Sequence, residues 1–140
     1  MEVSEFALIF TILVIYLTLS IAFFVQPRTV FFTPFPLLSR LSMVAFRPGS
    51  ETRFELYIPE GISIIMEEDR IVLEGADYNP ALIKSLMVTG LIKRLKGRTL
   101  YLNIRFPHPV ILEGGFVYYL KLRSLNMELV EVEVLRQSAS

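Results

Sequence analysis

The side chains that could do chemistry in this sequence do not form a recognisable catalytic set. The chain has a single histidine, His108, placed between Pro107 and Pro109, and it has no cysteine. A catalytic imidazole needs polar partners that orient it, and a metal site needs further ligands. We therefore interpret His108 as a structural residue in a loop between two strands.

The acidic and hydroxyl side chains also lack the spacing of a known site. Glu67, Glu68 and Asp69 are adjacent, whereas a calcium loop spaces its oxygen ligands and includes a glycine. No serine stands in a G-x-S-x-G motif, and there is no glycine-rich phosphate loop. We expect a solvated polar turn at 67–69 and a non-enzymatic protein with no catalytic residue, no metal and no cofactor.

A basic run near the middle of the chain has two interpretations. It could contact lipid phosphates or an acidic partner, or it could complement the carboxyl end of a helix, which we favour. Together with Glu5, its cations are the candidate interaction residues: Lys93, Arg94, Lys96 and Arg98. The 14 basic and 14 acidic residues balance, so the composition argues against nucleic acid as a partner.

The strongest signal is an uncharged apolar run from Phe6 to Val25. About 20 helical residues span the roughly 30 Å of a bilayer core. A cleaved signal peptide would have a basic start and a small-residue cleavage site, and a buried helix of this size would need a larger domain around it. We predict a membrane anchor over 1–26, formed by Phe6, Leu8, Ile9, Phe10, Ile12, Leu13, Val14, Ile15, Leu17, Leu19, Ile21, Phe23, Phe24 and Val25.

The remaining chain is predicted to be mainly β. Residues 27–50 are rich in proline and phenylalanine and are interpreted as a stalk with short strands that packs on the domain or on the membrane interface. From 51 to 140, apolar and polar residues alternate, as in 54–58, 100–106 and 130–134. This pattern predicts an antiparallel β-sandwich that ends in a long hairpin.

The segment from Asn79 to Gly97 is ambiguous. Asn79 could cap a helix that begins at Pro80, and Gly97 could end it after a basic last turn, which predicts a helix over 80–96. The cations lie around much of the helical wheel, however, and Val88 to Gly90 would also suit a strand and turn. We favour the helix.

The whole architecture resembles archaeal type IV pilin-like proteins and the stator-like subunits of the archaellum. The features that carry the resemblance are Glu5 ahead of the apolar run, the segment 54–61, the strand 71–73 and the segment 114–118. Pilin precursors carry a basic leader with a glycine or alanine cleavage site, whereas the sequence opens with Met1 and Glu2, so we expect no such leader here. The resemblance therefore implies the uncleaved anchor and extracytoplasmic β-sandwich of the non-pilin archaellum subunits.

Two functional hypotheses follow. The first is a structural or assembly component of a cell-surface filament apparatus, with membrane lipid and other protein subunits, including copies of itself, as partners and with no small-molecule substrate. The second is a single-pass accessory subunit of another membrane complex. Glu2 and Glu5 precede the apolar run and Arg28, Arg40 and Arg47 follow it, so the positive-inside rule argues for a cytoplasmic domain and against the extracytoplasmic location that we expect.

Overall fold

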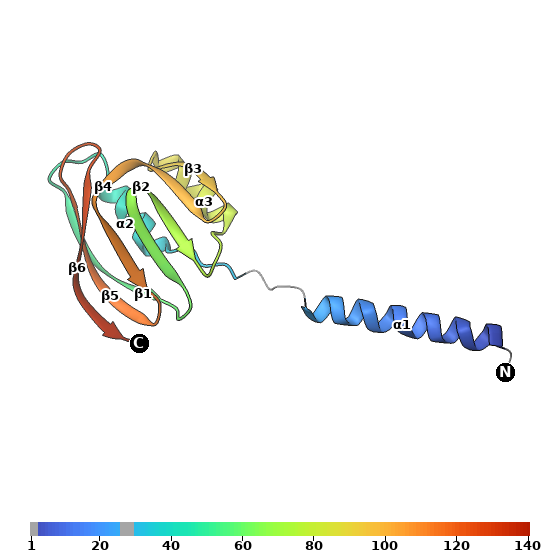
Figure 1. Ribbon diagram of the computed structural model, residues 1–140. Helices are drawn as coiled ribbons and strands as arrows, with labels where there is room; N and C mark the ends of the chain where they lie inside the picture. The colour runs from blue at the N-terminus through green and yellow to red at the C-terminus, as the bar shows by residue number, and fades with distance from the viewer. Residues whose placement is uncertain (1–2, 26–29) are drawn as a thin grey trace.

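A long N-terminal helix precedes a domain built mainly of strands (Figure 1). The computed structural model describes residues 3–25 and 30–140, with side chains over 3–21 and 30–140. The elements are α1 (Val3–Val25), α2 (Phe35–Val44), β1 (Glu51–Ile58), β2 (Ser63–Glu74), α3 (Pro80–Leu86), the short 3₁₀ helix η1 (Met87–Thr89), β3 (Ile92–Lys96), β4 (Thr99–Glu113), β5 (Phe116–Ser124) and β6 (Val130–Ala139). The predicted fold class, mainly β with antiparallel sheets and one N-terminal apolar helix, is confirmed.

The strands form two antiparallel three-stranded sheets, one in the order β1-β5-β6 and the other in the order β2-β4-β3. Because successive side chains of a strand point to opposite faces, one face of each strand contributes to a shared core. In β1, for example, Phe54, Leu56 and Ile58 are buried while Glu55 and Tyr57 are exposed. The long final hairpin of β5 and β6 is present as predicted.

A β-bulge bends β2 in its middle. Ile64 and Met66 are buried before the bulge and Ile71 and Leu73 after it, so the buried positions change from even to odd numbers. This change of parity is what an irregular insertion in one strand produces. The predicted polar reversal at 67–69 is thus a bulge within one strand.

The bend brings the two ends of β2 together. A Cβ atom on Gly75 would lie 2.1 Å from the carbonyl oxygen of Gly61. Since Gly75 also has a φ of +84°, both the left-handed backbone and the close approach require glycine at this position.

The stretch predicted as a stalk contains a helix of the core. Leu37, Leu38, Leu41 and Val44 of α2 are spaced by one helical turn and are all buried. Pro36 lies in the first turn, where a proline costs no intrahelical hydrogen bond. The expectation of short strands here was wrong because the prolines, which suggested extended chain, mark the start of a helix.

The predicted helix over 80–96 is correct only in its first half. Asn79 caps α3 by accepting a hydrogen bond from the Ala81 N–H at 3.0 Å, and Pro80 begins the helix, as expected. The helical chain ends at Gly90, which has a φ of +82°, and residues 92–96 form β3. Gly97, with a φ of +61°, turns the chain between β3 and β4 instead of capping a helix.

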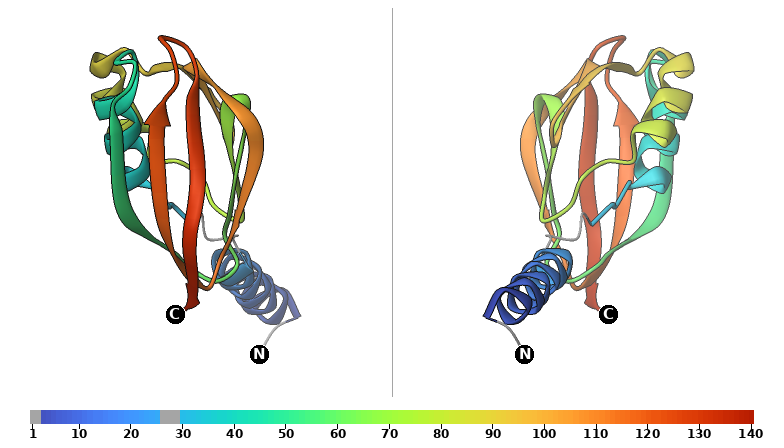
Figure 2. Two further views of the ribbon diagram at one scale, coloured as in Figure 1. Left: turned by 90° about the vertical axis from the view of Figure 1, so that its left-hand side faces the viewer. Right: turned by 90° about the vertical axis from the view of Figure 1, so that its right-hand side faces the viewer.

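The three short helical segments lie side by side along one side of the sheets (Figure 2). The N–H of Asn79 donates to Thr33 Oγ1 at 3.0 Å at one end, and Ser42 donates to Thr89 at 3.3 Å at the other. We call α2, α3 and η1 together the helical layer.

Two smaller predictions in the strands also need correction. His108 is an exposed residue within β4 and not in a loop between strands. On β6, Val130 is buried and Val132 packs against the core, but Val134 is 39% exposed. Beyond Val134 the register of β6 against β5 shifts by one residue, between the pairs Leu120–Val134 and Tyr119–Arg136.

Candidate functional site

The most distinctive functional element is α1, whose 23 residues extend for about 35 Å at the rise of an α-helix. Within Val3–Ile21 no side chain is buried by the rest of the protein. Among the described residues it is the one helix long and apolar enough to cross a membrane. The predicted anchor residues Phe6 to Ile21 therefore form one uncovered apolar surface, while the side chains of Phe23, Phe24 and Val25 lie outside the described part.

Three hydroxyl groups of α1 are satisfied within the helix. Thr11, Thr18 and Ser20 donate to the carbonyl oxygens four residues earlier, at 2.7, 2.8 and 2.9 Å. Such bonds hide hydroxyl groups that would otherwise be costly in an apolar medium. Glu5, in the first turn, is the acidic residue of the helix and lies near its N-terminal end, so the middle of the apolar surface carries no charge.

The predicted basic run does not form one patch of free cations. The Arg94 guanidinium lies 4.5 Å from the centre of the Tyr101 ring, and Arg98 forms an ion pair of 2.9 Å with Asp77. Lys96 is exposed at the end of β3, and Lys93 faces a hollow next to β4. The bend of the chain into β3 and β4 disperses these residues because consecutive side chains of a strand point to opposite faces.

Two carboxylates of the acidic cluster are paired with the neighbouring Arg70. Arg70 donates to Glu67 Oε1 at 3.1 and 3.3 Å, and its guanidinium is 3.9 Å from Glu68. These groups are at least one-third exposed, so the ion pairs contribute little to stability. Glu68 also has a φ of +51°, which is the local cause of the bend.

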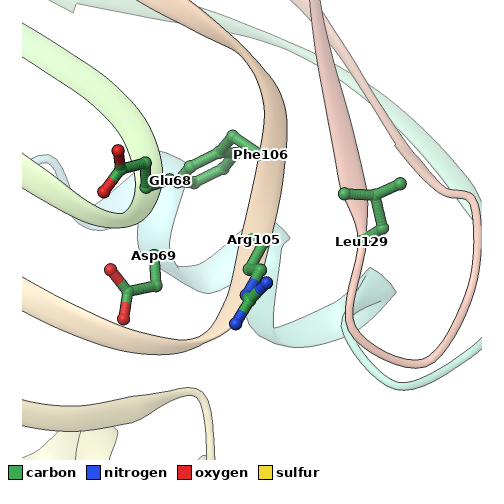
Figure 3. A pocket seen from close by; sticks show the side chains of 5 residues that line it. All are labelled: Glu68, Asp69, Arg105, Phe106 and Leu129. Atoms are coloured by element: carbon green, nitrogen blue, oxygen red, sulfur yellow. The ribbon is translucent and has the colours of Figure 1, made fainter.

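The bulge opens the larger of two neighbouring hollows, of about 490 Å³, between β2, β4 and the start of β6. Figure 3 shows its lining, with the carboxylates of Glu68 and Asp69 on one side and Arg105 beside them. The strand end at Leu129 is held there because Arg105 and Leu129 form an isolated parallel bridge. The predicted solvated turn at 67–69 was wrong, because these residues form a bulge within β2, and the sequence carries no signal for the partner strands.

Charges of both signs line the hollow and its neighbour of about 190 Å³. Asp69 and Arg105 line both, and Lys93, Asn103 and Glu128 belong to the smaller one. Most of these side chains are exposed, whereas an enzyme pocket generally surrounds its ligand and excludes water. The chemistry available is that of polar surface contacts.

Tyr101, Tyr118 and Tyr119 make separate structural contacts. Tyr118 is buried, accepts from the Glu113 N–H at 2.8 Å and donates to the Glu113 carbonyl at 2.9 Å. Tyr101 lies under Arg94, and Tyr119 lies 5.6 Å from the Arg136 guanidinium. Each ring has its own structural contact.

Charged residues along the final hairpin pair as charge complements. Lys121 lies 3.9 Å from Glu133 across the hairpin and 3.8 Å from Glu51 on β1. Arg123 stands opposite Glu131 in the same register. The charged side chains of the hairpin are therefore accounted for by pairing with neighbouring strands.

Comparison with known proteins gives no relative on which to base a function: no protein-family model, curated protein or solved structure matches the chain. The resemblance to pilin-like and archaellum proteins stays a prediction. The functional argument depends on the molecule's own geometry.

Proposed function

We propose that this chain is a single-pass membrane protein whose β domain is a non-catalytic interaction module of a membrane-associated assembly. One observation carries the proposal: α1 exposes an uncharged apolar surface over its central turns, and no part of the domain covers it. Exposed apolar surface of this size is costly in water and stable in lipid or against other apolar helices.

The domain supports the second half of the proposal. Its core is assembled from both sheets and α2, and within the described residues every buried polar side-chain atom has a hydrogen-bond partner. The buried polar groups of the domain thus find their hydrogen-bond partners without α1. Its polar hollow at the β2 bulge is suited to contact with another protein surface.

The more specific form of the proposal is a component of a cell-surface filament apparatus, and the alternative is an accessory subunit with a cytoplasmic domain. The filament form adds one requirement, which is that α1 packs against copies of itself or of partner helices. Close packing in lipid is favoured by small residues, and α1 contains Ala7, Ser20 and Ala22. The side of the membrane on which the domain lies separates the two forms.

The absence of cysteine from the sequence makes a topology experiment simple. Val3→Cys, before the apolar run, and Asn126→Cys, in the exposed β5–β6 loop, each introduce a single thiol. Alkaline extraction first shows whether each variant stays with the membrane. Labelling of each thiol with a membrane-impermeant maleimide is then compared between intact and opened cells.

Each outcome has a distinct meaning. Labelling of Asn126→Cys but not Val3→Cys in intact cells favours the cell-surface form, and the reverse favours the cytoplasmic accessory subunit. Release of the protein by alkaline extraction, or labelling of both thiols in intact cells, would contradict a membrane-spanning α1.

A further inference from the structure

The helical layer combines exposed apolar side chains with basic ones. Val88 is 89% exposed and Met43 is 54% exposed, and the other exposed apolar residues of the layer are Phe35, Leu82 and Met87. They belong to α2, α3 and η1, which are linked by the hydrogen bonds from Asn79 to Thr33 and from Ser42 to Thr89. Several large apolar side chains on one face of a soluble domain indicate a binding surface.

The charges of the protein are segregated with respect to this layer. No aspartate or glutamate occurs in 30–50 or in 79–92, whereas both stretches contain basic residues, Arg40, Arg47 and Lys84. The acidic residues that flank these stretches in the sequence are engaged elsewhere: Asp77 pairs with Arg98, and Glu51 pairs with Arg53 and lies near Lys121. Lys84 is exposed on α3 and Arg47 is exposed just beyond α2, whereas Arg40 of α2 is half-buried and donates to Thr52 Oγ1 at 3.2 Å. The layer and its edge thus present apolar and basic side chains in stretches without an acidic residue, although the chain has no net charge.

The position of the layer in the chain identifies its partner. Four residues separate Val25, the end of α1, from Val30, and they reach at most about 18 Å. Val30 and Phe31 are both more than half exposed, and α2 begins at Phe35. A membrane that holds α1 would thus always be within reach of this face, which gives a high effective concentration.

We propose that the helical layer, together with Val30 and Phe31, docks on the surface of an anionic bilayer, with its apolar side chains at the level of the headgroups and its cations facing lipid phosphates. This combination of apolar and basic residues without acidic ones is typical of interfacial membrane binding. The inference rests on the proposed anchoring by α1. Docking requires the side of the domain that carries the layer in Figure 2 to turn toward the surface from which α1 emerges, and the reach between Val25 and Val30 allows it.

The absence of tryptophan allows a direct test on the full chain. Val88→Trp places a single indole on the layer, at a side chain too exposed to disturb the core. Tyr16→Trp reports on α1, and Met127→Trp, at an exposed methionine in the β5–β6 loop, is the matched control away from the layer. Each protein is reconstituted in vesicles of phosphatidylcholine and phosphatidylglycerol that carry brominated acyl chains.

We expect the bromine atoms to quench Val88→Trp at least half as strongly as Tyr16→Trp, and to leave Met127→Trp nearly unchanged. Quenching of Val88→Trp should fall in vesicles of phosphatidylcholine alone. It should also fall when Lys84→Glu is added, but not when Arg136→Glu is added, because Arg136 lies on β6 and outside the layer.

The other outcomes overturn the inference in distinguishable ways. If Tyr16→Trp is quenched but Val88→Trp is no more quenched than Met127→Trp, anchoring stands and docking of the layer is wrong. If Val88→Trp shows a blue-shifted, unquenched spectrum that depends on protein density, a second copy covers the layer instead of lipid. If Tyr16→Trp itself is not quenched, the proposed anchoring fails as well.

Discussion

At the scale of single residues, two tyrosines stabilise the domain through buried phenols. Tyr78 is almost completely buried and donates to the Ile71 carbonyl at 3.0 Å, and burial raises its pKa far above the ordinary value. Burial also raises the pKa of Tyr118, against a smaller lowering by its hydrogen bond with the backbone of Glu113. Both groups keep their protons in the folded state at a pH where the unfolded chain loses them.

This difference predicts alkaline destabilisation. Above about pH 10 the unfolded state releases protons that the folded state retains, so the free energy of unfolding should fall by up to about 1.4 kcal/mol per pH unit for each group. Tyr78→Phe removes one of these titrating groups, so the free energy of unfolding should fall less steeply with pH. At neutral pH the same substitution should lower the free energy of unfolding by about 1 kcal/mol, because the hydrogen bond is lost. Urea unfolding in detergent across pH 8 to 11 measures both effects, and Tyr57→Phe, which changes an exposed tyrosine, should not reproduce the loss at neutral pH.

Two glycines with the same backbone conformation provide a second prediction. Gly75 and Gly90 have φ values of +84° and +82°, but a Cβ on Gly75 would meet the Gly61 carbonyl, whereas nothing lies within 4 Å of one on Gly90. Gly90→Ala should cost about 1–2 kcal/mol for the left-handed conformation alone. Gly75→Ala should cost roughly 1–3 kcal/mol more from the backbone displacement that it forces. Equal losses of stability for the two variants would show that the ends of β2 do not meet as described.

At the scale of elements, alternation made the regular strands predictable. The pattern of Phe54, Leu56 and Ile58 identified β1, and the glycines at 114–115 placed the turn between β4 and β5. The bulge in β2 was not predictable, since its position depends on pairing with a distant strand. The same is true of α2, whose leucines are spaced for a helix but stand among prolines that suggested extended chain.

The N-terminus of α3 shows where local sequence was sufficient. Asn79→Ala removes the oxygen that accepts from the Ala81 N–H, and it should lower the free energy of unfolding by about 1 kcal/mol. Asn79→Asp retains that oxygen and should lose much less. The comparison is made by urea unfolding, and an equal loss for both variants would contradict a capping role for Asn79.

The candidate site was likewise predictable from the sequence only in part. The long apolar helix could be predicted because an uncharged run of this length is typical of a helix that can cross a membrane, and its use as an anchor stays a proposal. The basic run at 93–98 could not be placed, because its side chains separate only when the chain turns at Gly97 and Arg98 reaches Asp77, 21 residues earlier. The filament function also stays a prediction, since it rests on architecture alone.

At the scale of the whole molecule, the domain contains its entire core without α1. The buried apolar cluster runs from Leu37 to Val130 and includes none of the α1 side chains that the structure describes, at 3–21. A chain shortened to residues 30–140 should therefore fold in the absence of detergent, with a melting temperature close to that of the domain in the full protein. Thermal unfolding followed by circular dichroism measures this, and an unfolded or aggregated product would show that the domain depends on α1.

The point at which the chain from α1 enters the domain also determines how the protein would respond to mechanical load. The chain enters the domain beside 77–79, where Phe32 donates to the Asp77 carbonyl at 3.0 Å, Asp77 donates to the Val30 carbonyl at 2.8 Å and Asn79 donates to Thr33. A pull transmitted through α1 reaches these three bonds before it reaches α2 or either sheet. These three bonds would be the first to break. The few residues before α2 would then extend under tension, while the sheets keep their register.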